Sequence, residues 1–164
     1  MPDVVILMGS KSDLDQAEKI GEALARLGLS YEIRVASAHK SPAYLLSMLQ
    51  EYEKQDAASE KAGPCRVYVT IAGRSNALSG FVDAAVSAPV IACPPYSEKF
   101  GGADIYSSLR MPSGVAPAVV LEPEAAALLA AKIMGKRKQV RAVQAEQSTR
   151  LVADDQSLRG EGAR

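Results

Sequence analysis

Short apolar runs alternate with amphipathic segments along most of the chain. The first run, Val4 to Met8, is followed by a glycine and then by a segment in which Ile20, Leu24 and Leu27 recur at helical spacing. Gly28 follows this segment, and glycine suits the left-handed position just beyond a helix. The pattern predicts a strand, a tight turn and a helix.

The same alternation repeats to about residue 135. Further strands are expected at residues 31–35, 65–73, 89–95 and 115–121, and further helices from Pro42 to Tyr52, over 74–88 and over 122–135. A polar loop is expected at 54–64, and an irregular loop with one short helix at 96–114. Nearly all-apolar strands that alternate with helices indicate a parallel sheet covered on both faces. We therefore expect an α/β fold, a flavodoxin-like doubly wound parallel sheet in three layers (αβα), with five strands in the order 2-1-3-4-5.

The composition changes after Gly135. Residues 136–164 are rich in charge, alanine and glutamine, with Val140, Val143, Gln147 and Leu151 on one weak stripe. We expect one domain over 1–135 and a C-terminal helical extension over 136–164. Two interpretations stay open for the extension: a helix that packs on a neighbouring subunit, or a frayed, solvated tail. The last several residues are expected to be disordered.

Composition and charge limit the partners. Nineteen basic residues balance nineteen acidic ones, so no overall field favours nucleic acid or an anionic membrane. No apolar run reaches the roughly 20 residues that span a bilayer, and the N-terminal run lacks the basic leader of a signal peptide, so a cytoplasmic location is expected. Cys65 and Cys93 lie far apart without metal-ligand spacing and are expected to be reduced, buried thiols.

Three loops that follow the first three strands are rich in small and hydroxylated residues. They read GSKSD (9–13), SAHKSP (37–42) and AGRSN (72–76). Because the carboxyl ends of parallel strands meet at one edge of the sheet, we expect these loops to open on one crevice.

The first loop suits a phosphate group. Gly9 permits a tight turn, and Ser10, Ser12 and the N-terminus of the following helix offer donors. The alternative is helix capping, since Ser12 and Asp15 have capping-box spacing. The chain has neither G-x-G-x-x-G nor G-x-x-x-x-G-K-[ST], so the usual dinucleotide and triphosphate fingerprints are missing.

The other two loops add basic and imidazole groups. His39, the single histidine of the chain, is a candidate general base, and Lys40 is a candidate phosphate partner. A structural histidine and an ordinary surface lysine are the competing interpretations. In the third loop, Arg74 can pair with an acidic residue of another loop or subunit, and Ser75 is a good N-cap for the next helix.

These motifs, MGSKSD (8–13), SAHK (37–40) and AGRSN (72–76), resemble those of one enzyme family. The chain is similar over residues 4–135 to the aminoimidazole ribonucleotide (AIR) carboxylases and carboxyaminoimidazole ribonucleotide mutases of purine biosynthesis. Lys40, the third turn without histidine, and the later CPP and SSLRMPSG segments look like the class II carboxylases of this PurE family.

The resemblance implies carboxylation of AIR with free CO2 to 4-carboxy-5-aminoimidazole ribonucleotide (CAIR), with no metal and no cofactor. It implies His39 as the catalytic base. It implies a substrate-binding set of Ser10, Ser12, Asp13, Ser37, Lys40, Gly73, Arg74, Ser75 and Asn76. It further implies a homo-oligomer, tetramer or octamer, with Tyr106, Ser107 and Arg110 near an adjacent subunit's site.

Two rival functions remain at this stage. One is the mutase of the same family, which acts on the N5-carboxylated ribonucleotide. The other is a flavodoxin-like module that binds a phosphorylated metabolite without chemistry. The strand ends here carry serines, His39 and Lys40 where a receiver-type signalling module would carry acidic residues.

Overall fold

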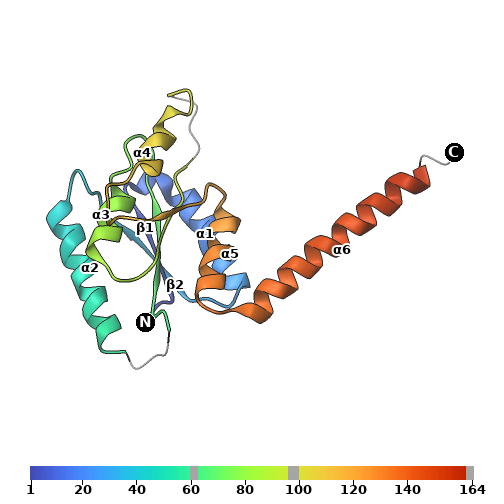
Figure 1. Ribbon diagram of the computed structural model, residues 1–164, viewed down its shortest axis with the longest axis horizontal. Helices are drawn as coiled ribbons and strands as arrows, with labels where there is room; N and C mark the ends of the chain where they lie inside the picture. Colours follow the sequence, from blue (N-terminus) through green and yellow to red (C-terminus); the bar gives the residue numbers. More distant parts are fainter. Residues whose placement is uncertain (60–62, 96–99, 162–164) are drawn as a thin grey trace.

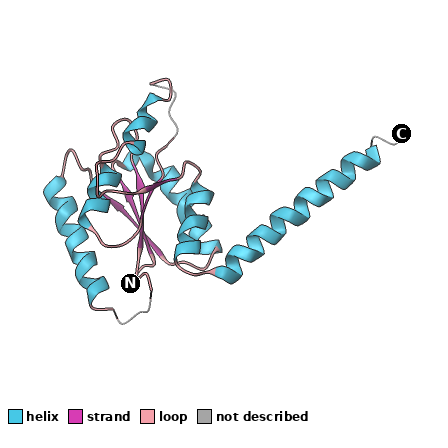
Figure 2. Ribbon diagram, viewed as in Figure 1, coloured by secondary structure: helices cyan, strands magenta, loops and turns pink. Residues whose placement is uncertain are grey.

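The computed structural model describes residues 1–59, 63–95 and 100–161, and its centre is a five-stranded parallel sheet (Figures 1 and 2). The strands are β1 (Val4–Met8), β2 (Tyr31–Val35), β3 (Val67–Ile71), β4 (Val90–Ala92) and β5 (Ala118–Val119). Their order, β2-β1-β3-β4-β5, is the doubly wound order that the sequence predicts. The fold class is therefore confirmed.

Four helices cover the two faces of the sheet: α1 (Leu14–Arg26), α2 (Pro42–Ala57), α3 (Leu78–Ala85) and α5 (Pro123–Ile133). The other described helical elements are α4 (Tyr106–Leu109), α6 (Arg137–Glu161) and the single 3-10 turns η1 (Lys11–Asp13) and η2 (Ala103–Ile105). Figure 1 shows α1 and α5 on one side of the sheet and α2 and α3 on the other. This is the three-layer arrangement that right-handed crossovers produce.

The alternation of side chains along β1 explains the two cores. Ile6 and Met8 pack in the cluster beneath α1 and α5, whereas Val5 and Leu7 pack in the cluster beneath α2 and α3. All five residues of β1 are buried, which is why this strand reads as a continuous apolar run with no polar alternation.

An ion pair anchors the end of the sheet opposite the three loops. Arg66, fully buried, donates from Nη2 to Asp56 Oδ1 at 2.8 Å and from Nε to Asp56 Oδ2 at 3.0 Å. Its guanidinium also lies over the ring of Tyr52, 4.4 Å from the centroid. These contacts tie the end of α2 to the start of β3.

Several boundaries differ from the sequence prediction. Helix α3 begins at Leu78, not at residue 74, because residues 73–77 form the turn that carries part of the site. The last strand is confined to two residues, and α2 continues to Ala57, into the segment predicted as a polar loop. Polar residues on an exposed helical face resemble a loop in composition, which accounts for the last difference.

The C-terminal extension is a single helix, α6, that projects away from the sheet domain (Figure 1). Near its start Val140 is buried and Val143 packs against the core beneath α1 and α5. Beyond these contacts Leu151, Val152 and Leu158 are 69%, 54% and 68% exposed. The helical form is confirmed, and beyond Val143 most of the described side chains of α6 are exposed in the single chain. The predicted disorder of the last residues falls largely at 162–164, outside the described residues.

No helix within the described ranges is both long and apolar enough to cross a membrane.

Candidate functional site

The turns after β1, β2 and β3 line one cavity of about 400 Å³ at the carboxyl edge of the sheet. Its walls are Gly9, Ser10, Ser12, Asp13, Ser37, Ala38, His39, Lys40, Ala72, Gly73, Arg74, Ser75, Leu78 and Pro95. The predicted convergence of the three turns is therefore found. The ionisable side chains on this wall are three basic ones, His39, Lys40 and Arg74, and one acidic one, Asp13.

Backbone geometry fixes the first turn. Gly9 N–H donates to the carbonyl of Ile71 at 2.9 Å, which ties the turn to β3. Ser10 is the N-cap of η1: its Oγ accepts from Ser12 N–H at 3.2 Å and from Ser12 Oγ at 2.9 Å. The predicted capping box of Ser12 and Asp15 is wrong, because η1 intervenes and α1 begins only at Leu14.

Asp13 stands at the junction of η1 and α1. Burial raises the pKa of its carboxyl above the ordinary value, and the hydrogen bond from Ser12 only partly offsets this rise. A carboxylate lining an otherwise basic and hydroxylated cavity is suited to accept hydrogen bonds from ligand hydroxyls.

The second turn is closed by its own serines. Ser37 N–H donates to Ser41 Oγ at 3.1 Å, and Lys40 N–H donates to Ser37 Oγ at 3.2 Å. This closure presents His39 and Lys40, both exposed, on the wall of the cavity. The imidazole is neither buried nor packed away from the first turn, so a ligand in the cavity can reach it.

The third turn has an unusual backbone. Arg74 adopts φ 60°, the only positive φ of a non-glycine residue among those described, in a region that side chains with a Cβ disfavour. Its backbone N–H donates to Asp104 Oδ2 at 3.3 Å. The turn thus brings Gly73, Arg74 and Ser75 to the cavity.

Asn76 has a different place from the one predicted. It is 3% exposed and is not part of the cavity wall. Its Oδ1 accepts from Ser79 N–H at 3.2 Å and its Nδ2 donates to Ser108 Oγ at 2.9 Å. Asn76, and not Ser75 as predicted, therefore caps the N-terminal turn of α3.

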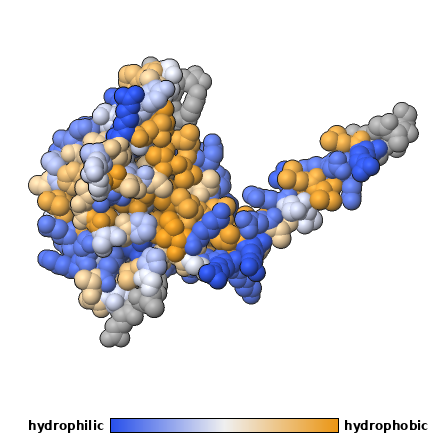
Figure 3. All heavy atoms as spheres, viewed as in Figure 1, coloured by the Kyte–Doolittle hydropathy of each residue, from blue (hydrophilic) through white to orange (hydrophobic). Residues whose placement is uncertain are grey.

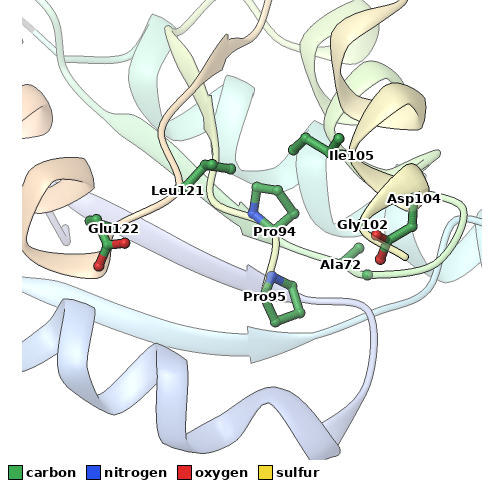
Figure 4. A pocket seen from close by; sticks show the side chains of 9 residues that line it. Ala72, Pro94, Pro95, Gly102, Asp104, Ile105, Leu121 and Glu122 are labelled. Carbon is green, nitrogen blue, oxygen red and sulfur yellow. The ribbon is translucent and has the colours of Figure 1, made fainter. Parts of the chain in front are cut away.

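A smaller cavity of about 200 Å³ adjoins the first and shares Ala72, Gly73 and Pro95 with it (Figure 4). The rest of its lining is Pro94, Gly102, Asp104, Ile105, Leu121 and Glu122. Figure 4 shows Leu121 beside Pro94, and the shared boundary consists of Ala72, Gly73 and Pro95, so the part near the shared wall is largely apolar. A Cβ added to Gly73 would stand 3.3 Å from Pro95 Cγ, so glycine keeps this boundary open.

Three further predicted residues lie outside the main cavity. Tyr106 is exposed, and Ser107 and Arg110 line a separate hollow beside α3. Ser107 contacts the third turn of its own chain. Sequence reasoning in turn missed four wall residues, Ala38, Ala72, Leu78 and Pro95. The available signal for Ala38, Ala72 and Pro95 was their position just beyond the carboxyl ends of β2, β3 and β4, whereas Leu78 begins α3.

The two cysteines are free. Cys93 is buried, and its burial raises the pKa of the thiol to about 11. Cys65 is only partly buried, which corrects the prediction of two buried thiols. Among the residues described, no cluster of three histidine, cysteine or acidic side chains could hold a metal ion.

The fold and this site define a doubly wound α/β protein with a cavity at the carboxyl ends of its strands that is suited to a small anionic ligand. Lys40 and Arg74 supply positive charge, the serines supply hydroxyl donors, and His39 supplies one group able to accept a proton.

Comparison with known proteins identifies the family. The family model for AIR carboxylase matches residues 3–153, and the chain belongs to this family. A phosphoribosylaminoimidazole carboxylase of Archaeoglobus fulgidus is 54% identical over 160 residues, covering 94% of this chain and 84% of that protein. A phosphoribosylaminoimidazole carboxylase of Treponema denticola is 50% identical over 163 residues, covering 96% of this chain and 98% of that protein.

A solved structure gives the same result. The crystal structure of Treponema denticola PurE superposes with a TM-score of 0.87 at 51% identity and covers 94% of this chain and 97% of that one. The likeness therefore extends well into α6, beyond the segment on which the sequence motifs depend.

Proposed function

We propose that this protein carboxylates AIR with CO2 to give CAIR, a step of purine nucleotide biosynthesis. The observation that carries the proposal is the single cavity in which the serine-rich first turn, His39 and the third turn converge. The family to which the chain belongs and its similarity to named phosphoribosylaminoimidazole carboxylases support the choice of substrate.

The chemistry needs one base and a positioned substrate. The electron-rich C4 of the aminoimidazole attacks the carbon of CO2, forming a carbon–carbon bond and leaving a ring that carries both the new carboxylate and the original proton. Removal of that proton by a base returns the electron pair to the ring and restores aromaticity. His39 is the one imidazole of the chain and lies on the cavity wall, so we assign it this role.

The other wall residues then hold the ribonucleotide. Ser10, Ser12, Ser37 and Lys40 contact the phosphate and ribose, and Asp13 accepts from the ribose hydroxyls. Gly73, Arg74 and Ser75 face the imidazole and its carboxylate. Lys40 and Arg74 balance the charge of the phosphate and of the carboxylate that forms.

The smaller cavity suits the second substrate. CO2 is small and apolar and offers few handles for binding, so enclosure beside C4 is the main contribution that a protein can make. The smaller cavity adjoins the main one across Ala72, Gly73 and Pro95. We assign CO2 to this side of the site.

The mutase of the same family is the competing activity. The absence of histidine from the third turn (Gly73 to Asn76) and the lysine at position 40 favour direct use of CO2. A module that binds the ribonucleotide without chemistry leaves the exposed His39 on the cavity wall without a role.

We also propose that the protein is a homo-oligomer in which α6 packs on a second copy. Beyond Val143 the helix projects away from its own domain (Figure 1), and Leu151, Val152 and Leu158 are exposed there. Figure 3 shows apolar patches on the projecting helix, apart from the sheet domain. Burying three such side chains contributes several kcal/mol, at about 1.5–3 kcal/mol each.

Replacing His39 tests the assignment of the base. His39→Asn keeps a polar side chain of similar size at an exposed position, so the affinity for AIR should stay close to that of the parent. Turnover should fall by about 10²–10⁴, the usual contribution of a general base. Calorimetric titration with AIR and the rate of CAIR formation measure the two effects, and turnover near the parental rate would contradict the role of His39.

A further inference from the structure

The third turn is held by a segment about thirty residues further along the chain, at η2 and α4. Arg74 N–H donates to Asp104 Oδ2 at 3.3 Å, and Asn76 N–H donates to Ser107 Oγ at 2.9 Å. The Ser107 hydroxyl hydrogen faces two carbonyl oxygens, those of Asp104 at 2.7 Å and Arg74 at 3.3 Å. One hydroxyl therefore contacts the backbone on both sides of Ser75.

A second serine completes the connection. Ser108, 1% exposed, accepts from Asn76 Nδ2 at 2.9 Å, while Asn76 Oδ1 accepts from Ser79 N–H at the start of α3. The turn is thus fixed between α3 and α4 by polar contacts, of which the two made by the Asn76 side chain are buried. Such contacts are directional, so they specify one backbone conformation rather than simply filling space.

The turn needs this support. The left-handed conformation of Arg74 is one that a residue with a side chain adopts only where its surroundings impose it. Gly73 and Ser75, on either side of Arg74, line the cavity, and Asp104 and Ile105 of η2 line the adjoining smaller cavity. The same short segment therefore contacts the turn that lines the main cavity and itself lines the smaller cavity.

We propose that Ser107 is a positioning residue for the reaction: through Arg74 and Asn76 it fixes Gly73 and Ser75 against the substrate. This inference rests on the proposed function for its kinetic consequence. The role lies within one chain, in contrast to the contribution to a neighbouring subunit that the sequence resemblance implies for Ser107.

Ser107→Ala and Ser107→Thr test the proposal. Alanine removes the acceptor for Asn76 N–H, whereas threonine keeps the hydroxyl, and Ser107 is only partly buried, so a methyl group has room. For alanine we expect faster hydrogen exchange at the amides of the third turn. We also expect a fall in kcat of about 10- to 100-fold, as for a misplaced reacting group, with a smaller change in the KM for AIR. The threonine variant should recover most of the parental kcat and most of the parental protection of the third turn from hydrogen exchange.

The matched control is Ser47→Ala. Ser47 is exposed on α2, and its Oγ donates to the Tyr44 carbonyl at 2.9 Å, so the change removes a serine hydrogen bond away from the site. It should leave both readouts at the parental values. If Ser107→Ala does not fold, Asp104→Ala removes the acceptor for Arg74 N–H instead. Because Asp104 also lines the smaller cavity, its readout is hydrogen exchange alone, which should be faster at Arg74; parental exchange there would contradict the support of the turn by this segment.

Two results would overturn the proposal. One is parental exchange and turnover in Ser107→Ala. The other is a Ser107→Thr variant that is as impaired as alanine although its thermal stability equals that of the parent. Hydrogen exchange distinguishes a failure of this proposal from a failure of the proposed function. A parent protein that does not consume AIR refutes the function. Exchange at the amides of the third turn then still decides the role of Ser107.

Discussion

At the scale of single residues, position in the fold decides which polar groups meet a ligand. Ser10, His39 and Ser75 lie far apart in the sequence, but each follows the carboxyl end of a parallel strand and so reaches one cavity. This could be predicted from strand order alone. Asn76 could not, because whether a residue one step further along the turn faces the cavity or the protein interior depends on the left-handed backbone at Arg74.

Capping was the least predictable property at this scale. Both the predicted cap at Ser75 and the predicted capping box at Ser12 lie close to the residues that do the capping, Asn76 and Ser10. Serine, aspartate and asparagine are all good caps, so composition alone cannot choose among neighbours. The backbone of the turn makes the choice.

The raised pKa of Asp13 predicts a pH-dependent gain in stability when the charge is removed. A folded-state pKa above the unfolded value of 3.8 means that the carboxyl favours folding below that pH, and that this contribution is lost as the pH rises through the folded pKa. Asp13→Asn should therefore raise the free energy of unfolding at neutral pH, and the gain should shrink as the pH falls. Urea unfolding at several pH values measures it.

Asp15→Asn is the control for Asp13, because Asp15 is an exposed carboxylate at the start of the same helix. It should show no comparable gain. If Asp13→Asn were less stable than the parent at neutral pH, the burial assigned to the carboxyl would be incorrect. A gain in stability accompanied by weaker AIR binding fits a group kept for function and not for folding.

At the scale of elements, the sequence predicts which helices and strands exist better than it predicts the residues at which they begin and end. Strands β1 and β2 have the predicted bounds, whereas β3 lies inside the predicted range 65–73 and is two residues shorter at each end. Strand β5 has two residues and depends on pairing with β4, a property that no local pattern records. The short α4 likewise depends on its bonds to the third turn.

The buried ion pair between α2 and β3 gives a prediction at this scale. Asp56→Ala leaves the guanidinium of Arg66 without its carboxylate in a fully buried position. Removing one partner of such a pair costs about 3–5 kcal/mol. Urea unfolding should show this loss in the free energy of unfolding. The protein concentration is held fixed, because association contributes to the stability of an oligomer.

Asp155→Ala serves as the matched control for Asp56. Its pair with Arg159 spans 3.9 Å on the exposed surface of α6, where ion pairs contribute little. Because α6 is also the proposed contact with a second copy, the control variant must sediment like the parent. Equal losses in the two variants would show that burial does not set the cost. The Asp56 site lies at the opposite end of the sheet from the cavity, so AIR affinity in the folded variant should be unchanged.

At the scale of the whole molecule, α6 is the feature that the chain alone does not explain. Because the helix extends away from its domain with exposed leucines, we expect it to pack against a second copy of the chain. A chain ending at Gln144 keeps Val140 and Val143 against the core and removes the projecting part. We expect this shortened chain to fold and to sediment as an assembly of fewer subunits than the full-length protein.

The pair of changes Leu151→Asp and Leu158→Asp is the companion to this truncation, since it keeps α6 but makes its apolar positions charged. It should give the same smaller species. A full-sized assembly in both cases would mean that other surfaces hold the copies together.

The central claim is that this protein joins free CO2 to AIR, and a comparison of two substrates tests it most directly. Purified protein is given AIR in a CO2-containing buffer and, separately, the N5-carboxylated ribonucleotide, and CAIR formation is followed by ultraviolet absorbance. If the protein uses free CO2, CAIR should form rapidly from AIR and CO2 without ATP. Faster consumption of the N5-carboxylated substrate, with little CAIR from AIR and CO2, would show that the protein is the mutase instead.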